Sequence, residues 1–264
     1  MIKAVIFDLD GTLVRTEELK ALSYFQGATD VKNDVTEESV TTAYKQVVGL
    51  SREEVSRHLV RVLDLEGPAR AQMHSLQVDE PWKVLGLKHL ANYERMIETP
   101  GLLEKYKCPY NTAFLEFVKR EGFRVGLATL SHRPETYRIL DILRLRALFD
   151  VIATREDVEK GKPDPGIYLF VAARLGVTPP ECLVIEDSVN GIRSALAAGM
   201  GCVAVTSSFT RPSVHESGLL EKQWIVDDHA MLMTVARQFI AEKRLADLTA
   251  RQSFSGMRRI PASR

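Results

Sequence analysis

Two aspartates, Asp8 and Asp10, stand at the end of an apolar run over residues 3–9, and Gly11 follows them at once. In open α/β sheets, ligands bind beyond the carboxyl ends of the strands, so acids at such an end are candidates for catalysis or metal binding. A single aspartate could simply cap the next turn. A calcium loop is excluded because Gly11 follows Asp10 directly. The pair therefore favours a functional site.

A second acidic pair, Glu186 and Asp187, follows the apolar run at 182–186 and precedes a segment of helical character. One polar side chain here can serve as a helix N-cap, but this leaves another carboxylate without a structural need. Acidic pairs after two buried strands are typical of a site for a hard cation, and Mg²⁺ prefers oxygen ligands. We therefore expect Mg²⁺ as a cofactor.

Groups that suit an anion lie between the acidic pairs. Lys162 stands in the sequence GKPDP, where a glycine and two prolines restrict the backbone and position the ammonium. Thr129, at the end of another apolar run, offers a hydroxyl and, with Leu130, backbone N–H groups. Ser131 and His132 are explained equally well as polar loop residues. No GxSxG turn supports Ser-His-Asp catalysis.

Runs of apolar, often β-branched residues predict the buried strands that must position these groups. They lie at 3–9, 123–129, 150–153, 182–186 and 202–206, with a weaker run at 224–226. Amphipathic stretches of helical length separate most of them, at 111–121, 134–145, 166–176 and 189–198. Strands and helices that alternate in this way predict an α/β fold around a parallel sheet.

Residues 16–99 break this alternation because they contain helical patterns and no comparable strand. We expect an inserted helical domain there, with residues 1–15 and 100–247 forming the α/β domain. Residues 248–264 are rich in serine and arginine and weakly patterned, which favours a basic C-terminal tail at the surface.

Taken together, DLDGTL at residues 8–13, Thr129, the GKPDP lysine and EDSVNG at residues 186–191 resemble the four motifs of the haloacid dehalogenase-like phosphohydrolase superfamily, in order and spacing. The resemblance covers nearly the whole chain. It implies a Rossmann-like parallel-sheet core with an α-helical cap inserted after the first motif, within the phosphoglycolate phosphatase and β-phosphoglucomutase-like subgroup.

The resemblance also assigns roles to individual residues. It implies that Asp8 is the nucleophile and Asp10 the general acid and base, with neighbouring carboxylates favouring the protonated form of Asp10. The groups implied for the transferring phosphoryl are Thr129, Leu130 and Lys162. The groups implied for Mg²⁺ are Asp8, the backbone carbonyl of Asp10, Glu186 and Asp187.

The helical insertion bears on the substrate. Its segment VGLSRE resembles a cap segment of β-phosphoglucomutases, in which an arginine at the position of Arg52 reaches the far end of the substrate. A first-turn arginine paired with a glutamate is the simpler interpretation of Arg52. Val48 stands where the mutases commonly have lysine, and Lys20 where they often have histidine. Lys20 could favour an anionic substrate or face solvent.

These departures favour a Mg²⁺-dependent phosphatase that acts on a small phosphorylated metabolite, either phosphoglycolate-like or a sugar phosphate, through an aspartyl-phosphate. The alternatives are a hexose-phosphate mutase and, in another class, a non-catalytic binding module on the same fold.

Composition narrows the possible partners. The chain has 264 residues with 35 basic and 35 acidic side chains, and this balance argues against a globally basic nucleic-acid binder. No apolar run is long enough to cross a membrane. Three cysteines without a CxxC pair suit a reducing cytoplasm. We expect a monomer or weak dimer without a nucleic-acid or membrane partner.

Overall fold

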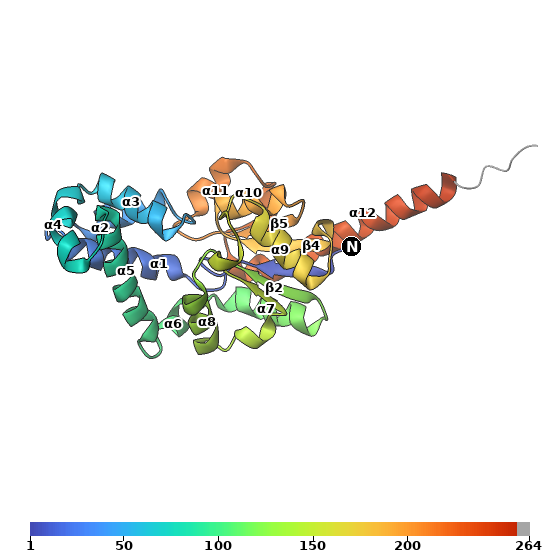
Figure 1. Ribbon diagram of the computed structural model, residues 1–264. Coiled ribbons are helices and arrows are strands. Elements are labelled where there is room, and N and C mark those ends of the chain that lie inside the picture. The colour runs from blue at the N-terminus through green and yellow to red at the C-terminus, as the bar shows by residue number, and fades with distance from the viewer. Residues whose placement is uncertain (258–264) are drawn as a thin grey trace, which may run out of the picture.

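The computed structural model describes the backbone of residues 1–257 and the side-chain environments of residues 1–249. Its centre is a sheet of parallel strands in the order β3-β2-β1-β4-β5-β6 (Figure 1). The strands are β1 (Ala4–Phe7), β2 (Arg124–Ala128), β3 (Val151–Ala153), β4 (Cys182–Glu186), β5 (Gly201–Val205) and β6 (Ile225–Val226). Each lies within or next to an apolar run of the sequence, so the predicted α/β fold is confirmed.

Helices cover both faces of the sheet, which explains why the strands are apolar throughout. Along β1, Val5 and Phe7 belong to one apolar cluster, whereas Ala4 and Ile6 belong to another on the opposite face. The first face is packed by α7 (Pro109–Arg120), α8 (Arg133–Ile142) and α12 (Leu232–Met257). The second is packed by α9 (Gly166–Leu175), α10 (Val189–Ala197) and α11 (Arg211–Ser217).

Strand register brings the sequence motifs together. Phe7 pairs with Leu127 on one side and with Ile185 on the other. The residues that follow these three positions therefore leave the sheet at one edge. The two acidic pairs and Thr129 lie at that edge.

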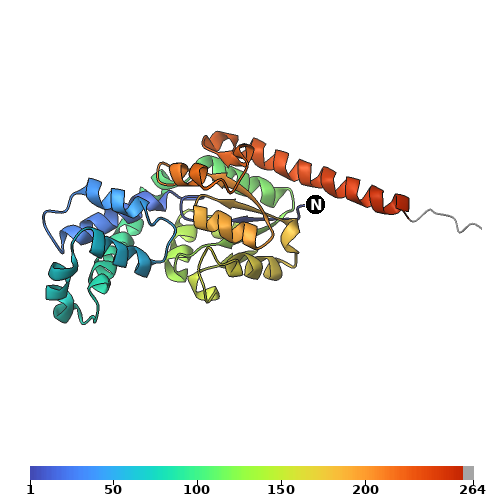
Figure 2. The ribbon, with the colours of Figure 1, turned by 90° about the horizontal axis from the view of Figure 1, so that it is seen from above.

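Residues 16–99, here called the helical region, are all among the described residues and contain helices but no strand. They are α1 (Thr16–Thr29), α2 (Glu37–Lys45), α3 (Arg52–Val62), α4 (Glu66–Leu76) and α5 (Pro81–Glu98). They enclose an apolar cluster of their own that includes Tyr24, Leu59 and Leu85. Figures 1 and 2 show this region beyond one end of the sheet.

The chain enters and leaves the helical region at adjacent points. Val14 forms an antiparallel bridge with Lys107, next to α6 (Leu102–Tyr106). The Arg15 N–H donates to the Tyr106 carbonyl at 2.8 Å, and the Cys108 N–H donates to the Leu13 carbonyl at 2.9 Å. The two connections are therefore hydrogen-bonded to each other.

The C-terminal segment differs from its expected form. Helix α12 continues to Met257 and projects away from the sheet (Figure 2), so a helix covers the first ten residues of the expected weakly patterned tail. Strong helix formers in the sequence AEKRLADL explain the continuation. Residues 258–264 lie outside the described residues.

Two further expectations were tested on the described residues. Cys108, Cys182 and Cys202 are buried and unpaired, as their spacing predicted. None of the helices has the length and apolar character needed to traverse a lipid bilayer.

Candidate active site

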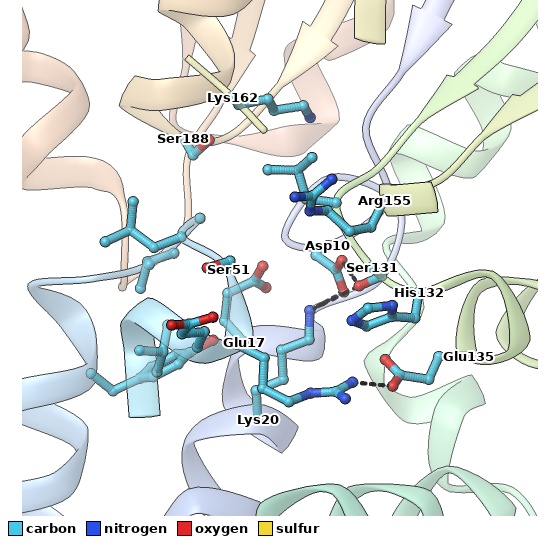
Figure 3. A pocket seen from close by; sticks show the side chains of 18 of the residues that line it. Asp10, Glu17, Lys20, Ser51, Ser131, His132, Glu135, Arg155, Lys162 and Ser188 are labelled. Atoms are coloured by element: carbon cyan, nitrogen blue, oxygen red, sulfur yellow. Dashed lines mark hydrogen bonds and ion pairs between the residues drawn. The ribbon is translucent and has the colours of Figure 1, made fainter. Parts of the chain in front are cut away.

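A cavity of about 280 Å³ lies between the carboxyl edge of the sheet and the helical region (Figure 3). This volume suits a small molecule. Every site residue expected from the sequence lines it except Thr129 and Glu186, which are fully buried behind its wall. The expected site residues that line the cavity are Asp8, Asp10, Lys20, Arg52, Leu130, Lys162 and Asp187.

Asp8 is buried at the end of β1 and is held by Lys162, whose Nζ donates to Asp8 Oδ1 at 2.7 Å. Burial raises the pKa of Asp8 to about 7, with further increases from the charges of Glu186 and Asp10 and an opposing effect of Lys162. Lys162 also donates to the Ala128 carbonyl at 3.0 Å. The lysine is therefore fixed against the edge of the sheet.

Glu186 acts mainly as a support for Lys162. Its Oε1 accepts from Lys162 at 2.5 Å and from the Tyr168 hydroxyl at 2.7 Å. Its Oε2 accepts from the N–H groups of Asp187 and Ser188 at 2.9 and 3.1 Å. A Cβ at Gly191 would lie 1.9 Å from this carboxyl group, so the start of α10 leaves just enough room for it. Both carboxylate oxygens are thus already engaged by the protein.

Asp187 has the opposite character. It is 2% exposed, and its Oδ2 has no hydrogen-bond partner among the described residues. Burial, then the charges of Glu17, Glu186 and Asp8, raise the pKa of Asp187 well above its ordinary value. A Cβ at Gly11 would lie 2.0 Å from Asp187 Oδ2, so only glycine leaves this oxygen its place. An unpaired buried carboxylate of this kind calls for a cation.

The acidic cluster fits a divalent ion. Oxygens of Asp8, Glu186 and Asp187 lie within 4.8 Å of one another, and all three residues are buried. Carboxylate oxygens are the ligands that Mg²⁺ prefers. Since Glu186 is already engaged, Asp8 and Asp187 are the side chains best suited to direct contact, with Glu186 behind them.

Asp10 lies in a different environment from Asp8. It forms an ion pair of 2.7 Å with Lys20 and accepts a hydrogen bond from Ser131 (Figure 3). It also accepts from Thr16 and, at 3.3 Å, from Thr129. Burial raises the pKa of Asp10, but the charge of Lys20 and these hydrogen bonds outweigh it, so the pKa lies below its ordinary value. The expectation that neighbouring carboxylates favour the protonated form was therefore wrong for Asp10 in the protein alone.

Thr129 is completely buried and does more than end a strand. Its hydroxyl accepts from the Ser131 N–H at 3.0 Å and lies beside Asp10, while its own N–H donates to the Ala153 carbonyl at 3.0 Å. Leu130 follows it in the cavity wall. The turn after β2 thus supports Asp10 and borders the space in front of Asp8.

The wall contributed by the helical region is partly aromatic. The rings of Tyr24 and His89 are stacked with centroids 3.7 Å apart and an interplanar angle of 2°. His89 Nδ1 lies 2.7 Å from the Ser23 hydroxyl. Burial, then the charges of Arg52 and Lys20, hold the pKa of His89 well below its ordinary value. The neutral form of the imidazole is therefore favoured in this wall.

Arg52 spans the cavity at the start of α3. A capping box of Ser51 and Glu54 begins this helix, so the position of Arg52 in its first turn is well defined. Its guanidinium forms an ion pair with Glu135 of α8 (Figure 3). The sequence anticipated a glutamate partner for Arg52, but the partner comes from the sheet region and not from its own helix.

Several residues of the cavity were not singled out from the sequence. Glu17, Glu135 and Arg155 line it, and Tyr168 supports it from behind. Glu17 follows the first motif closely and Tyr168 follows GKPDP closely, so their proximity to motifs was an available signal. Glu135 also follows a motif, that of Thr129, but its pairing with Arg52 carried no signal because the two residues are 83 positions apart in the chain.

Comparison with known proteins agrees with this geometry. The family model described as haloacid dehalogenase-like hydrolase matches residues 2–199. The chain is 32% identical over 201 residues to a phosphorylated carbohydrates phosphatase of Thermotoga maritima, covering 75% of this chain and 82% of that protein. It is 31% identical over 207 residues to a β-phosphoglucomutase of Bacillus subtilis, covering 77% and 83%.

Solved structures share the fold. A β-phosphoglucomutase from Clostridium difficile superimposes with a TM-score of 0.70 at 24% identity, over 94% of this chain and all of that one. The expected Rossmann-like architecture is thereby confirmed.

Proposed function

This chain belongs to the haloacid dehalogenase-like hydrolase family and is a phosphohydrolase, and we propose that it hydrolyses a small phosphorylated metabolite through an aspartyl-phosphate. The candidate substrates are phosphoglycolate-like compounds and sugar phosphates. One observation carries the proposal: Asp8 and Lys162 are held 2.7 Å apart beside a cavity of small-molecule size, with Asp10 at the same edge of the sheet.

The roles that we propose for the side chains are those implied by the family resemblance, and the positions of the residues support them. Asp8 attacks phosphorus, which splits one difficult displacement into two easier ones. Lys162 offsets negative charge on the transferring group, and the turn of Thr129 and Leu130 orients its oxygens. Asp10 protonates the leaving oxygen and then accepts a proton from the attacking water.

Lys20 bears on the second of these steps. Its ion pair stabilises the carboxylate form of Asp10, which is the form that accepts a proton from water. The first step needs the protonated form of Asp10, so Lys20 favours the second step, hydrolysis of the aspartyl-phosphate, over the first.

The acidic cluster supports Mg²⁺ as the cofactor. Asp8, the backbone carbonyl of Asp10 and Asp187 would hold the ion, with Glu186 behind them. When bound, the ion offsets the charge of the acids and of the phosphate. Nucleophilic attack and proton transfer are carried out by the side chains named above.

We further propose that residues 16–99 act as a cap over a core of residues 1–15 and 100–247. The separate apolar cluster of the helical region supports this division. Closure of the cap would exclude bulk water, and its opening would release product. A cytoplasmic location, favoured by the buried free cysteines, stays a prediction.

The test is a panel of phosphorylated metabolites assayed for phosphate release with and without Mg²⁺, with Asp8→Asn as the blank. We expect Mg²⁺-dependent release from at least one compound and none from the variant. Equal release by the variant would overturn the assignment of Asp8, and no release from any compound would favour a binding module.

The similarity to the Bacillus subtilis enzyme keeps a mutase as the second candidate. The two are separated by supplying β-glucose 1-phosphate and following the products. Conversion to glucose 6-phosphate indicates a mutase, whereas release of glucose and phosphate indicates a phosphatase.

A further inference from the structure

The far end of the cavity, away from Asp8, decides what leaving group fits. Arg52 is the cation best placed to meet it, yet its guanidinium is paired with Glu135, a side chain only 10% exposed. The carboxylate neutralises the arginine where a second anionic group of a substrate would have to bind.

The other basic side chains around this end are engaged as well. Lys20 is paired with Asp10 at 2.7 Å, and His132 Nδ1 lies 2.6 Å from Glu156. Arg155 donates to the carbonyls of Val158 and Glu159 at 2.7 and 3.3 Å. Apart from Asp8, Asp10, Asp187 and Lys162 at the edge of the sheet, the described residues that line the cavity include three acids and three lysines or arginines. The far end therefore has no surplus of positive charge for an anionic tail.

The same groups suit a hydroxylated tail. The Arg52–Glu135 pair presents hydrogen-bond donors and acceptors side by side, as a row of hydroxyl groups requires. Tyr24 and His89, whose rings are stacked on each other, also line the cavity and contribute aromatic surface to its wall. Such a mixture of aromatic wall and a few placed polar groups is typical of small-molecule sites.

We propose that Glu135 is a specificity-determining residue that makes this enzyme select phosphate monoesters with an uncharged, hydroxylated leaving group, such as a polyol or sugar, against those with an anionic tail. The inference rests on the proposed phosphatase activity. Within the candidate substrates, it favours sugar monophosphates over phosphoglycolate-like compounds and bisphosphates.

The experiment uses substrate pairs that differ in one charged group. Fructose 6-phosphate is compared with fructose 1,6-bisphosphate, and 2-hydroxyethyl phosphate with 2-phosphoglycolate, by kcat/KM of the Mg²⁺-loaded enzyme. We expect the uncharged member of each pair to be preferred at least about tenfold, because like charges brought together at a site are strongly unfavourable. This comparison needs only the natural chain.

The variant Glu135→Gln keeps the shape of the side chain and removes its charge. It frees Arg52 for an anionic tail, so the preference for the uncharged member should fall by about tenfold in both pairs. The matched control is Glu98→Gln. Glu98 also forms an ion pair from the helical region to α8, with Arg138 at 2.5 Å, but neither residue lines the cavity. The control should leave the preference unchanged.

The possible failures are distinguishable. If the natural enzyme hydrolyses the anionic-tail compounds as well as their partners, the inference is overturned and the proposed function stands. The same holds if Glu135→Gln and Glu98→Gln behave alike. If none of the compounds in this set or the wider panel is hydrolysed, the proposed function fails and the inference fails with it.

Discussion

The two ends of the cavity are built by different means. At the sheet end, the ion pair of Lys162 and Glu186 has side chains 5% and 0% exposed, and both are held by several partners. At the helical end, Arg52 is 25% exposed and has one ionic partner. Buried charges with many partners cost much free energy to disturb, whereas a partly exposed pair costs little.

We infer from this difference that the sheet end carries out the reaction and the helical end determines which substrate is accepted. The sheet end uses residues that follow three adjacent strands, so the fold itself brings them together. The helical end uses single contacts between two regions, and these can change without disturbing the sheet. We therefore expect substitutions at the sheet end to abolish turnover and substitutions at the helical end to redirect it.

The largest effect is expected for Asp8→Asn. Turnover should fall by at least about a thousandfold and no aspartyl-phosphate should form, because the amide is a poor nucleophile. Phosphate release and acid trapping of the phosphorylated protein measure this. Glu135→Gln, at the other end, should retain turnover. An equal loss of turnover in Asp8→Asn and Glu135→Gln would contradict the contrast between the two ends.

Asp187→Asn should weaken Mg²⁺ binding by roughly ten- to a hundredfold, because it removes the one unpaired buried carboxylate of the cluster. Isothermal titration of the metal into the apoprotein measures this without any substrate. Glu186→Gln serves as the comparison and should disturb Lys162 more than the metal. Unchanged affinity in Asp187→Asn would place the ion elsewhere.

Lys20→Met is the change that tests whether the two ends are separate, since Lys20 belongs to the helical region and pairs with Asp10. We expect kcat to fall about tenfold or more with a smaller change in KM. Lys20 lowers the pKa of Asp10, so its removal should move the acidic limb of the pH–rate profile, which reports the carboxylate form of Asp10, to higher pH. An effect on KM alone would make Lys20 a substrate-binding residue.

A smaller effect concerns stability without metal. The pKa of Asp8 is raised from 3.8 to about 7, so the native state holds its proton more tightly than the unfolded chain. Native stability should therefore decrease as pH rises from about 4 to 7. Asp8→Asn removes this cost and should be more stabilising at pH 8 than at pH 5, by at least about 1 kcal/mol. Urea unfolding in EDTA measures it; a pH-independent difference would contradict it.

The smallest effect is expected within the helical region, away from the cavity. Thr36 caps α2 by accepting from the Ser39 N–H at 3.2 Å. Thr36→Ala should cost about 1 kcal/mol of stability. Turnover at saturating substrate should not change, since Thr36 does not line the cavity and the helix remains folded. Thermal unfolding and kcat report the two quantities, and a parallel loss of both would link this helix to catalysis.

What could be predicted from the sequence follows the same division. Asp8, Asp10, Lys162 and Asp187 were identified because each lies next to a strand or in a rigid loop, where local sequence determines position. Glu135 was not, because its pairing with Arg52 depends on how two helices distant in the chain are packed. The fold was predictable because apolar runs mark its strands.

Electrostatic behaviour was harder to foresee than position. The protonation of Asp10 was judged from the carboxylates expected around it in the site, but Lys20, ten residues on, has the larger effect through the packing of α1. Likewise, Glu186 was expected as a metal ligand, and its hydrogen bonds to Tyr168 and the start of α10 show that it also orients Lys162. Only the folded arrangement reveals which partner each charge has.

The adjacent connections at Val14 and Lys107 have a consequence for how this enzyme could diversify. Because the chain leaves the sheet region and returns to it through two connecting segments that are hydrogen-bonded to each other, a loop of a few residues could bridge the gap. Insertions of quite different length could be grafted there without altering the strands. At this junction, one insertion could replace another and change the substrate preference, while the catalytic residues at the edge of the sheet stay in place.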